Sequence, residues 1–105
     1  MIPFDKIKVG PFDISVVSLF PEDKEECLGQ FSPFDLTVEL REDYTTQQQE
    51  AETLLHELLH AIWYTMAIAA EREVEEKVVG PMSVGLAMVI RDNPDLINWI
   101  REKLL

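Results

Sequence analysis

The sequence predicts a single α+β domain spanning residues 1–105, in which a small, mainly antiparallel β-meander is followed by three helices. Two observations support this fold class. Short segments rich in β-branched and aromatic residues, bounded by turn-forming residues, are confined to roughly the first forty residues. Longer segments with apolar residues at helical spacing occupy the remainder. A chain of 105 residues can form one hydrophobic core and has no room for a second lobe.

Four strands are expected in the N-terminal part. The last of them is the clearest, because Leu36, Val38 and Leu40 alternate with Thr37 and Glu39, the pattern of a half-buried strand. A turn at residues 10–11 should join the first two strands, and the charged segment 21–26 should be an exposed loop. The expected strands are residues 6–9, 12–20, 28–31 and 36–40.

The first helix should begin at Thr45 or Thr46, since these residues together with Gln48 and Gln49 form overlapping capping boxes. No glycine or proline interrupts it before about Ala70. Its second half is apolar almost all round, which predicts a buried helix.

Two further helices should follow the charged segment 71–77. The first of them contains Gly80-Pro81, which predicts a kink or two separate segments. For the second, Asn93 suits the N-cap and Pro94 the first helical position, and the helix should reach about Lys103. The apolar residues expected to face the core are Val78, Val79, Met82, Leu86 and Val89 in the first helix, and Leu96, Ile97, Ile100 and Leu104 in the second.

A polar stripe crosses the apolar half of the first helix. His56, Glu57 and His60 form an HExxH pattern, and with Tyr64 they fall within an arc of about 100°. Residues four apart lie on one face of a helix, so the two imidazoles could bind one zinc ion while Glu57 polarises the bound water. Buried polar groups need partners, and a metal ion facing a cleft would supply them.

A catalytic zinc site requires a third protein ligand. The chain has no third histidine, and its single cysteine, Cys27, is expected to be incidental. A carboxylate from the next helix is therefore favoured. The candidates are Glu71, Glu73, Glu75 and Glu76. Glu71 lies too close to His60 for the chain to turn back, and helical periodicity slightly favours Glu75. Most of these four glutamates should be solvated.

With its β-meander, the HELLH segment on a buried helix and a glutamate-bearing helix, the chain resembles the zincin metallopeptidases, particularly the gluzincin-like group. It is most similar to small phage-associated proteins related to the ImmA/IrrE and SprT-like metallopeptidases. The segment 76–83 is loosely similar to the ligand-bearing ExEANxFA helix of the ImmA/IrrE proteins. Laid on that motif, Glu76 takes the ligand position, although Val78, Gly80 and Pro81 depart from it. The resemblance thus implies His56, His60 and Glu76 as zinc ligands.

The predicted function is zinc-dependent hydrolysis of peptide bonds, with Glu57 as general base and acid. In zincins, the strand beside the active helix pairs with the extended substrate, which suggests residues 36–40 here. Tyr44, Tyr64 or Arg72 could stabilise the oxyanion, although Tyr64 is expected to pack in the core. Two alternatives remain: a catalytically inactive, zinc-stabilised protein-binding module, and an α+β adaptor without metal.

The charge and the apolar pattern disfavour nucleic-acid binding and a membrane span. A net charge of −11 disfavours nucleic-acid binding, because such a surface repels phosphate. The apolar run at residues 54–70 is short for a bilayer and contains Glu57, which disfavours a membrane span. The N-terminal residues lack a signal-peptide pattern, so a cytoplasmic protein acting on a peptide or protein substrate is expected. The substrate and the oligomeric state do not follow from the sequence.

Overall fold

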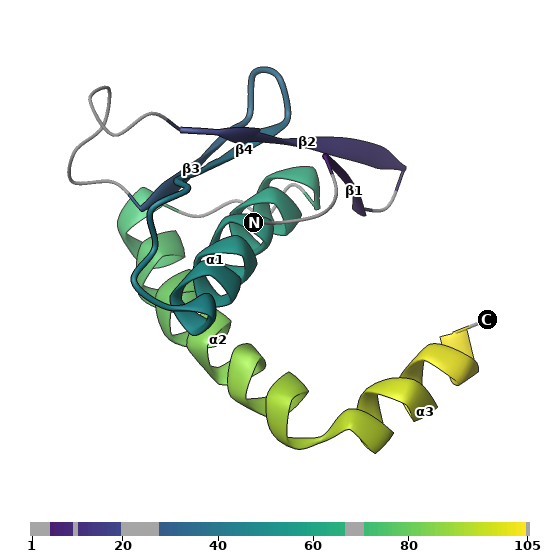
Figure 1. Ribbon diagram of the computed structural model, residues 1–105. Coiled ribbons are helices and arrows are strands. Elements are labelled where there is room, and N and C mark those ends of the chain that lie inside the picture. The colour runs from purple at the N-terminus through teal and green to yellow at the C-terminus, as the bar shows by residue number, and fades with distance from the viewer. Residues whose placement is uncertain (1–4, 10, 20–27, 67–70, 105) are drawn as a thin grey trace.

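The structure is a computed structural model that describes residues 5–9, 11–19, 28–66 and 71–104. It is an α+β fold, as the sequence predicts. Figure 1 shows a sheet lying over α1, with α2 beside α1 and α3 continuing in a new direction from the far end of α2. In chain order the elements are β1 (Lys6–Val9), β2 (Phe12–Ser18), β3 (Gly29–Ser32), β4 (Thr37–Leu40), α1 (Gln47–Thr65), α2 (Arg72–Asp92) and α3 (Pro94–Leu104).

The sheet is mixed and is not a simple meander, although the expectation of a mainly antiparallel sheet holds for two of its three strand pairs. Its strand order is β1-β2-β4-β3, and β4 runs parallel to β2, with Val16 opposite Val38. The other two pairs are antiparallel. Side-chain alternation indicates which face of a strand is buried but carries no information on which strand lies beside it. The sequence pattern therefore located the strands and missed their order.

The turn between β3 and β4 occupies residues 33–36. Leu36 has a φ of 52°, the left-handed region that non-glycine residues seldom adopt, and so β4 begins at Thr37, one residue later than expected. The predicted alternation is confirmed, because Val38 and Leu40 are buried while Thr37 and Glu39 are partly exposed.

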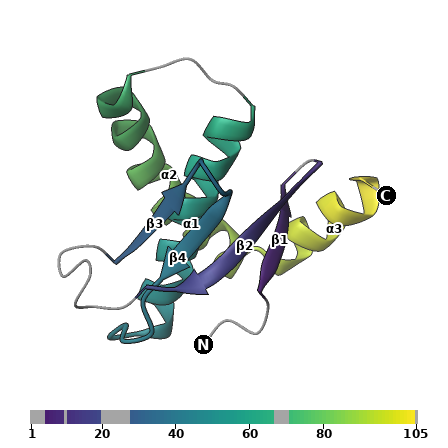
Figure 2. The same cartoon turned by 90° about the horizontal axis from the view of Figure 1, so that it is seen from above.

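The core lies between the sheet and α1. Ile14, Val38 and Leu40 from the sheet pack with Ala61 of α1, and Leu54 adds to this cluster. Seen from above, the strands run across α1 (Figure 2). The face of α1 that is most buried consists of residues four apart, which places its glutamate in the interior; these residues are Thr53, Glu57 and Ala61.

The start of α1 agrees with the predicted capping box. Thr46 is the N-cap, and its hydroxyl accepts a hydrogen bond from the backbone N–H of Gln49 at 3.0 Å. The Gln49 side chain reaches back and accepts a hydrogen bond from the backbone N–H of Thr45 at 3.0 Å. These bonds satisfy helix-end donors that have no intrahelical partner. The expected extension of this helix to Ala70 lies outside the described residues.

Helix α2 is continuous through Pro81, so the prediction of two segments is wrong. Its buried face is also narrower than expected: Val79 and Ser83 are buried, whereas Val78, Met82 and Val89 are exposed. The Ser83 hydroxyl donates a hydrogen bond to the carbonyl of Gly80, the residue before the proline, at 2.7 Å. The narrow stripe follows from the packing, because among the described elements α2 packs mainly against α1.

Asn93 stands between α2 and α3, where the sequence predicted an N-cap. Its carbonyl accepts the Ile97 N–H at 3.2 Å, which opens α3, but its side-chain amide donates to the Val89 carbonyl and so caps the end of α2. The side chains of Leu96, Ile100 and Leu104 lie outside the described part of the structure, as do the loop 21–26 and Cys27. Within the described ranges, no helix combines the length and apolar character needed to cross a bilayer.

Candidate metal centre

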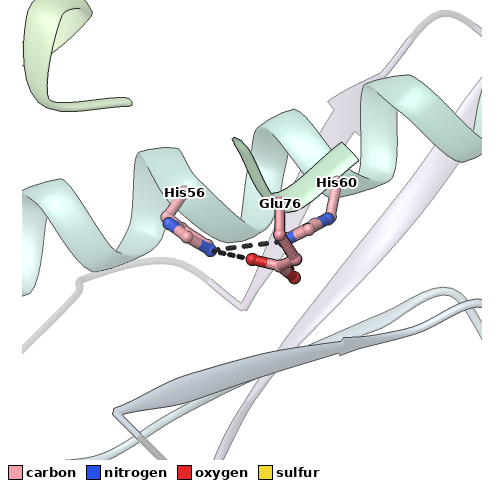
Figure 3. A group of neighbouring side chains, drawn as sticks. All are labelled: His56, His60 and Glu76. Atoms are coloured by element: carbon pink, nitrogen blue, oxygen red, sulfur yellow. Dashed lines mark hydrogen bonds and ion pairs between the residues drawn. The ribbon is translucent and has the colours of Figure 1, made fainter. Parts of the chain in front are cut away.

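Two helices bring together three side chains with metal-binding chemistry. His56 and His60 project from the same face of α1, and Glu76 reaches them from α2 (Figure 3). The Nε2 atoms of the two histidines are 3.2 Å apart. The Glu76 Oε1 atom lies 3.0 Å from Nε2 of His60, and its Oε2 atom lies 3.7 Å from Nε2 of His56. Three donor groups therefore converge on one point.

These separations suit a zinc ion. Zinc binds histidine nitrogen and carboxylate oxygen at about 2.0–2.2 Å in a tetrahedral arrangement, which places neighbouring ligand atoms about 3.3 Å apart. The two Nε2 atoms, 3.2 Å apart, are close to this separation, and the two oxygens of Glu76 lie 3.0 Å from one nitrogen and 3.7 Å from the other. Two imidazoles and one carboxylate would leave the fourth position open, as catalytic zinc sites do. The residues present thus fit the ion.

The neutral state of the His56 imidazole also favours metal binding. Burial, and secondarily the neighbouring His60, lowers the pKa of His56 below its ordinary value of 6.5, while the charge of Glu76 raises it less strongly. The imidazole is therefore mainly neutral at pH 7, which is the form that binds a metal ion.

Glu57 lies beside this cluster and is almost fully buried, with 6% of its surface exposed. Burial raises the pKa of its carboxyl from 4.5 to about 7; nearby His60 opposes the rise and Glu76 adds to it. Loss of water disfavours the charged form of an acid, which explains the direction. A carboxyl group with such a pKa can both accept and donate a proton at neutral pH.

Glu75, the rival candidate for the third ligand, contacts a different atom. Its carboxylate pairs with Nδ1 of His60, on the other side of the ring from the converging Nε2 atoms. Glu71 and Glu73 are exposed, as expected of most of this acidic run. The structure therefore places Glu76, and not Glu75, with the two Nε2 atoms.

The cluster opens onto a broad cleft between α1, α2 and β3, with a volume of about 1680 Å³. The predicted polar stripe lines it, since His56, Glu57, His60 and Tyr64 all border the cleft. Tyr64 is 54% exposed, so the expectation that it packs in the core is wrong. Its ring leans on Phe31 of β3, with centroids 6.1 Å apart, and so it helps to form the aromatic wall of the cleft.

The three oxyanion candidates differ in position. Tyr64 and Arg72 line the cleft. The Tyr44 hydroxyl donates to the Leu28 carbonyl at 2.6 Å and accepts the Arg41 N–H at 3.1 Å, so it is engaged in holding a loop. The Trp63 ring also lines the cleft, but its Nε1–H is buried and finds no acceptor within the described residues. Tyr64 and Arg72 therefore remain the candidates.

The strand expected to pair with substrate, β4, has no free edge. β4 lies between β2 and β3 and is paired on both edges, so it cannot accept a further strand. The outer strand of the sheet on this side is β3, and its residues Gln30 and Phe31 border the cleft. Strand order decides this point, and alternation in the sequence contains no signal for it.

Gly29 permits β3 to approach α1, a role that sequence patterns did not indicate. A Cβ atom at this position would lie 2.9 Å from Cγ2 of Thr53 and 3.0 Å from the Glu39 carbonyl oxygen. Thr53 lies one turn before Glu57 on the buried face of α1. The missing side chain therefore brings the edge strand close to the helix that carries the histidines.

Comparison of the chain with family models, with curated proteins and with solved structures found no significant match.

Proposed function

We propose that the protein is a zinc-dependent metallopeptidase whose ion is held by His56, His60 and Glu76 and whose general base is Glu57. The observation that supports this most strongly is the convergence of two Nε2 atoms and one carboxylate at the side of an open cleft, next to a buried glutamate. An α+β adaptor without metal would have no need of three metal-binding groups clustered beside a buried acid.

A zinc ion at this position would polarise a peptide carbonyl and lower the pKa of a coordinated water to about 7. Glu57 takes a proton from the attacking water and passes it to the leaving amine, and its pKa of about 7 suits both steps. Tyr64 or Arg72 donates a hydrogen bond to the developing oxyanion from the cleft wall.

The shape and lining of the cleft favour an extended peptide as substrate. β3 is the outer strand beside the cleft, and an extended chain can add to such an edge through backbone hydrogen bonds. Phe31 and Tyr64 form an aromatic wall that suits an apolar substrate side chain.

The first test is metal content. The purified protein, loaded with zinc and dialysed, should retain about one zinc ion per chain, measured by plasma mass spectrometry. His60→Ala should lose it, since removal of one of three protein ligands leaves too few. Retention of equal zinc by His60→Ala, or failure of the wild-type chain to bind zinc, would refute the proposal.

The second test separates catalysis from structure. Zinc-loaded wild type should cleave fluorescein-labelled casein, and Glu57→Gln should lose at least about a hundredfold of this activity, the scale of general acid–base catalysis, while keeping its zinc. If Glu57→Gln cleaves casein as fast as wild type, the role of Glu57 is wrong. If wild type binds zinc but cleaves neither casein nor a mixed peptide library, the zinc-stabilised binding module replaces the peptidase.

A further inference from the structure

Two consecutive glutamates of α2 contact the two nitrogens of one imidazole. Glu75 pairs with Nδ1 of His60, and Glu76 lies 3.0 Å from Nε2 of the same ring. Adjacent residues on a helix point about 100° apart, so their side chains can reach a facing ring from two sides. This arrangement places Nε2 of His60 toward His56 and Glu76, and Nδ1 toward Glu75.

The Glu75–His60 contact is shielded from water. The His60 side chain is 11% exposed and that of Glu75 is 24% exposed, whereas that of Glu76 is 48% exposed. Glu71 and Glu73, from the same acidic run, are exposed. A carboxylate that is partly withdrawn from solvent, in a run whose other members remain exposed, has a specific partner to keep it there.

We propose that Glu75 is a positioning residue for metal binding, which accepts a hydrogen bond from Nδ1–H of His60 and so directs Nε2 to the metal. A neutral imidazole has one N–H and one lone pair. With the proton held on Nδ1 by Glu75, the lone pair lies on Nε2, which faces Nε2 of His56 at 3.2 Å and the Glu76 carboxylate. Carboxylates that hold a metal-binding histidine in this way also make the ring a better ligand.

The inference rests on the proposed metal site, and zinc affinity tests it. Competition with a chromophoric chelator should show that Glu75→Ala binds zinc about 10–100-fold more weakly than wild type, the usual cost of losing such a partner. Glu75→Gln should recover most of the affinity, because its amide oxygen can still accept the Nδ1–H bond. Glu73→Ala, an exposed neighbour on the same helix, is the matched control and should bind as wild type does.

The pattern of affinities separates positioning from direct coordination. If Glu75 were itself the third ligand, Glu75→Gln would bind as poorly as Glu75→Ala, and Glu76→Ala would bind nearly as well as wild type. Either result would overturn the inference, as would equal affinity of Glu75→Ala and wild type. Failure of wild type to bind zinc would instead refute the proposed function.

A second readout is independent of affinity. Nitrogen–proton NMR spectra of zinc-loaded protein labelled on histidine should show His60 protonated at Nδ1 and bound through Nε2, in wild type and in Glu75→Gln. Binding of zinc through Nδ1 of His60 would overturn the inference. This readout uses Glu75→Gln, so the inference remains testable if Glu75→Ala fails to fold.

Discussion

Replacing Glu57 with glutamine should change how the stability of the metal-free protein depends on pH. Burial raises the pKa of this carboxyl from 4.5 to about 7 in the folded chain. The folded state therefore holds the proton more tightly than the unfolded state, and the group's contribution to stability is complete below pH 4.5 and is lost as the pH rises through 7. Wild type should become less stable over this range.

The size of the effect follows from the pKa rise. Each pKa unit corresponds to about 1.4 kcal/mol, so a rise from 4.5 to about 7 corresponds to roughly 3 kcal/mol in the free energy of unfolding. Most of this change falls between pH 5 and pH 8. Glutamine has nearly the same volume and cannot ionise, so Glu57→Gln should lack this component of the pH dependence.

The assay is urea unfolding of both proteins at pH 5 and pH 8 with a chelator present, followed by circular dichroism. Other groups that titrate in this range, such as His56, are present in both chains, so the difference between the two proteins isolates Glu57. Glu57→Gln should be the more stable of the two at pH 8 by about 2–3 kcal/mol relative to the difference at pH 5. Parallel pH profiles would refute the claim that burial raises the pKa of Glu57.

Substitutions at three further positions test the packing and capping of the elements around the cleft. Gly29→Ala should destabilise the protein by about 1–3 kcal/mol, because its Cβ would lie 2.9 Å from Cγ2 of Thr53; urea unfolding measures this. Gly85→Ala is the matched control. Apart from the neighbouring backbone of its own helix, no described atom lies within 4 Å of the added Cβ, so this change in α2 should stabilise the chain by about 0.5–1 kcal/mol. A loss of stability would show that the added methyl group does not have this space. Thr46→Ala removes the N-cap of α1 and should cost about 0.5–2 kcal/mol in thermal or urea unfolding, whereas Thr46→Asp, which keeps a capping oxygen, should cost little.

Local chemistry explains why much of the fold could be read from the sequence. A helix N-terminus depends on residues three or four apart, and Thr46 and Gln49 form the predicted cap. Alternation in β4 depends on nearest neighbours, and Val38 and Leu40 are buried as predicted. The α+β class follows from where these two patterns occur along the chain.

Packing between elements explains the errors. The apolar residues Val78 and Met82 were expected to be buried, yet among the described elements α2 packs mainly against α1, and both side chains are exposed. Pro81 was expected to kink the helix or to divide it in two, and the helix is not divided there; the Ser83 hydroxyl donates to the Gly80 carbonyl beside the proline. Tyr64 was expected in the core and lies in the cleft wall, where it meets Phe31.

The candidate metal centre likewise has one part that the sequence predicts and one part that depends on packing. The sequence by itself determined that His56 and His60 share one face of a helix, because a spacing of four places side chains one above the other whatever surrounds them. Only the tertiary structure shows that Glu75 and Glu76, which are neighbours in the chain, reach opposite nitrogens of His60. That difference depends on how α2 lies against α1, a relation between distant residues that no local pattern encodes.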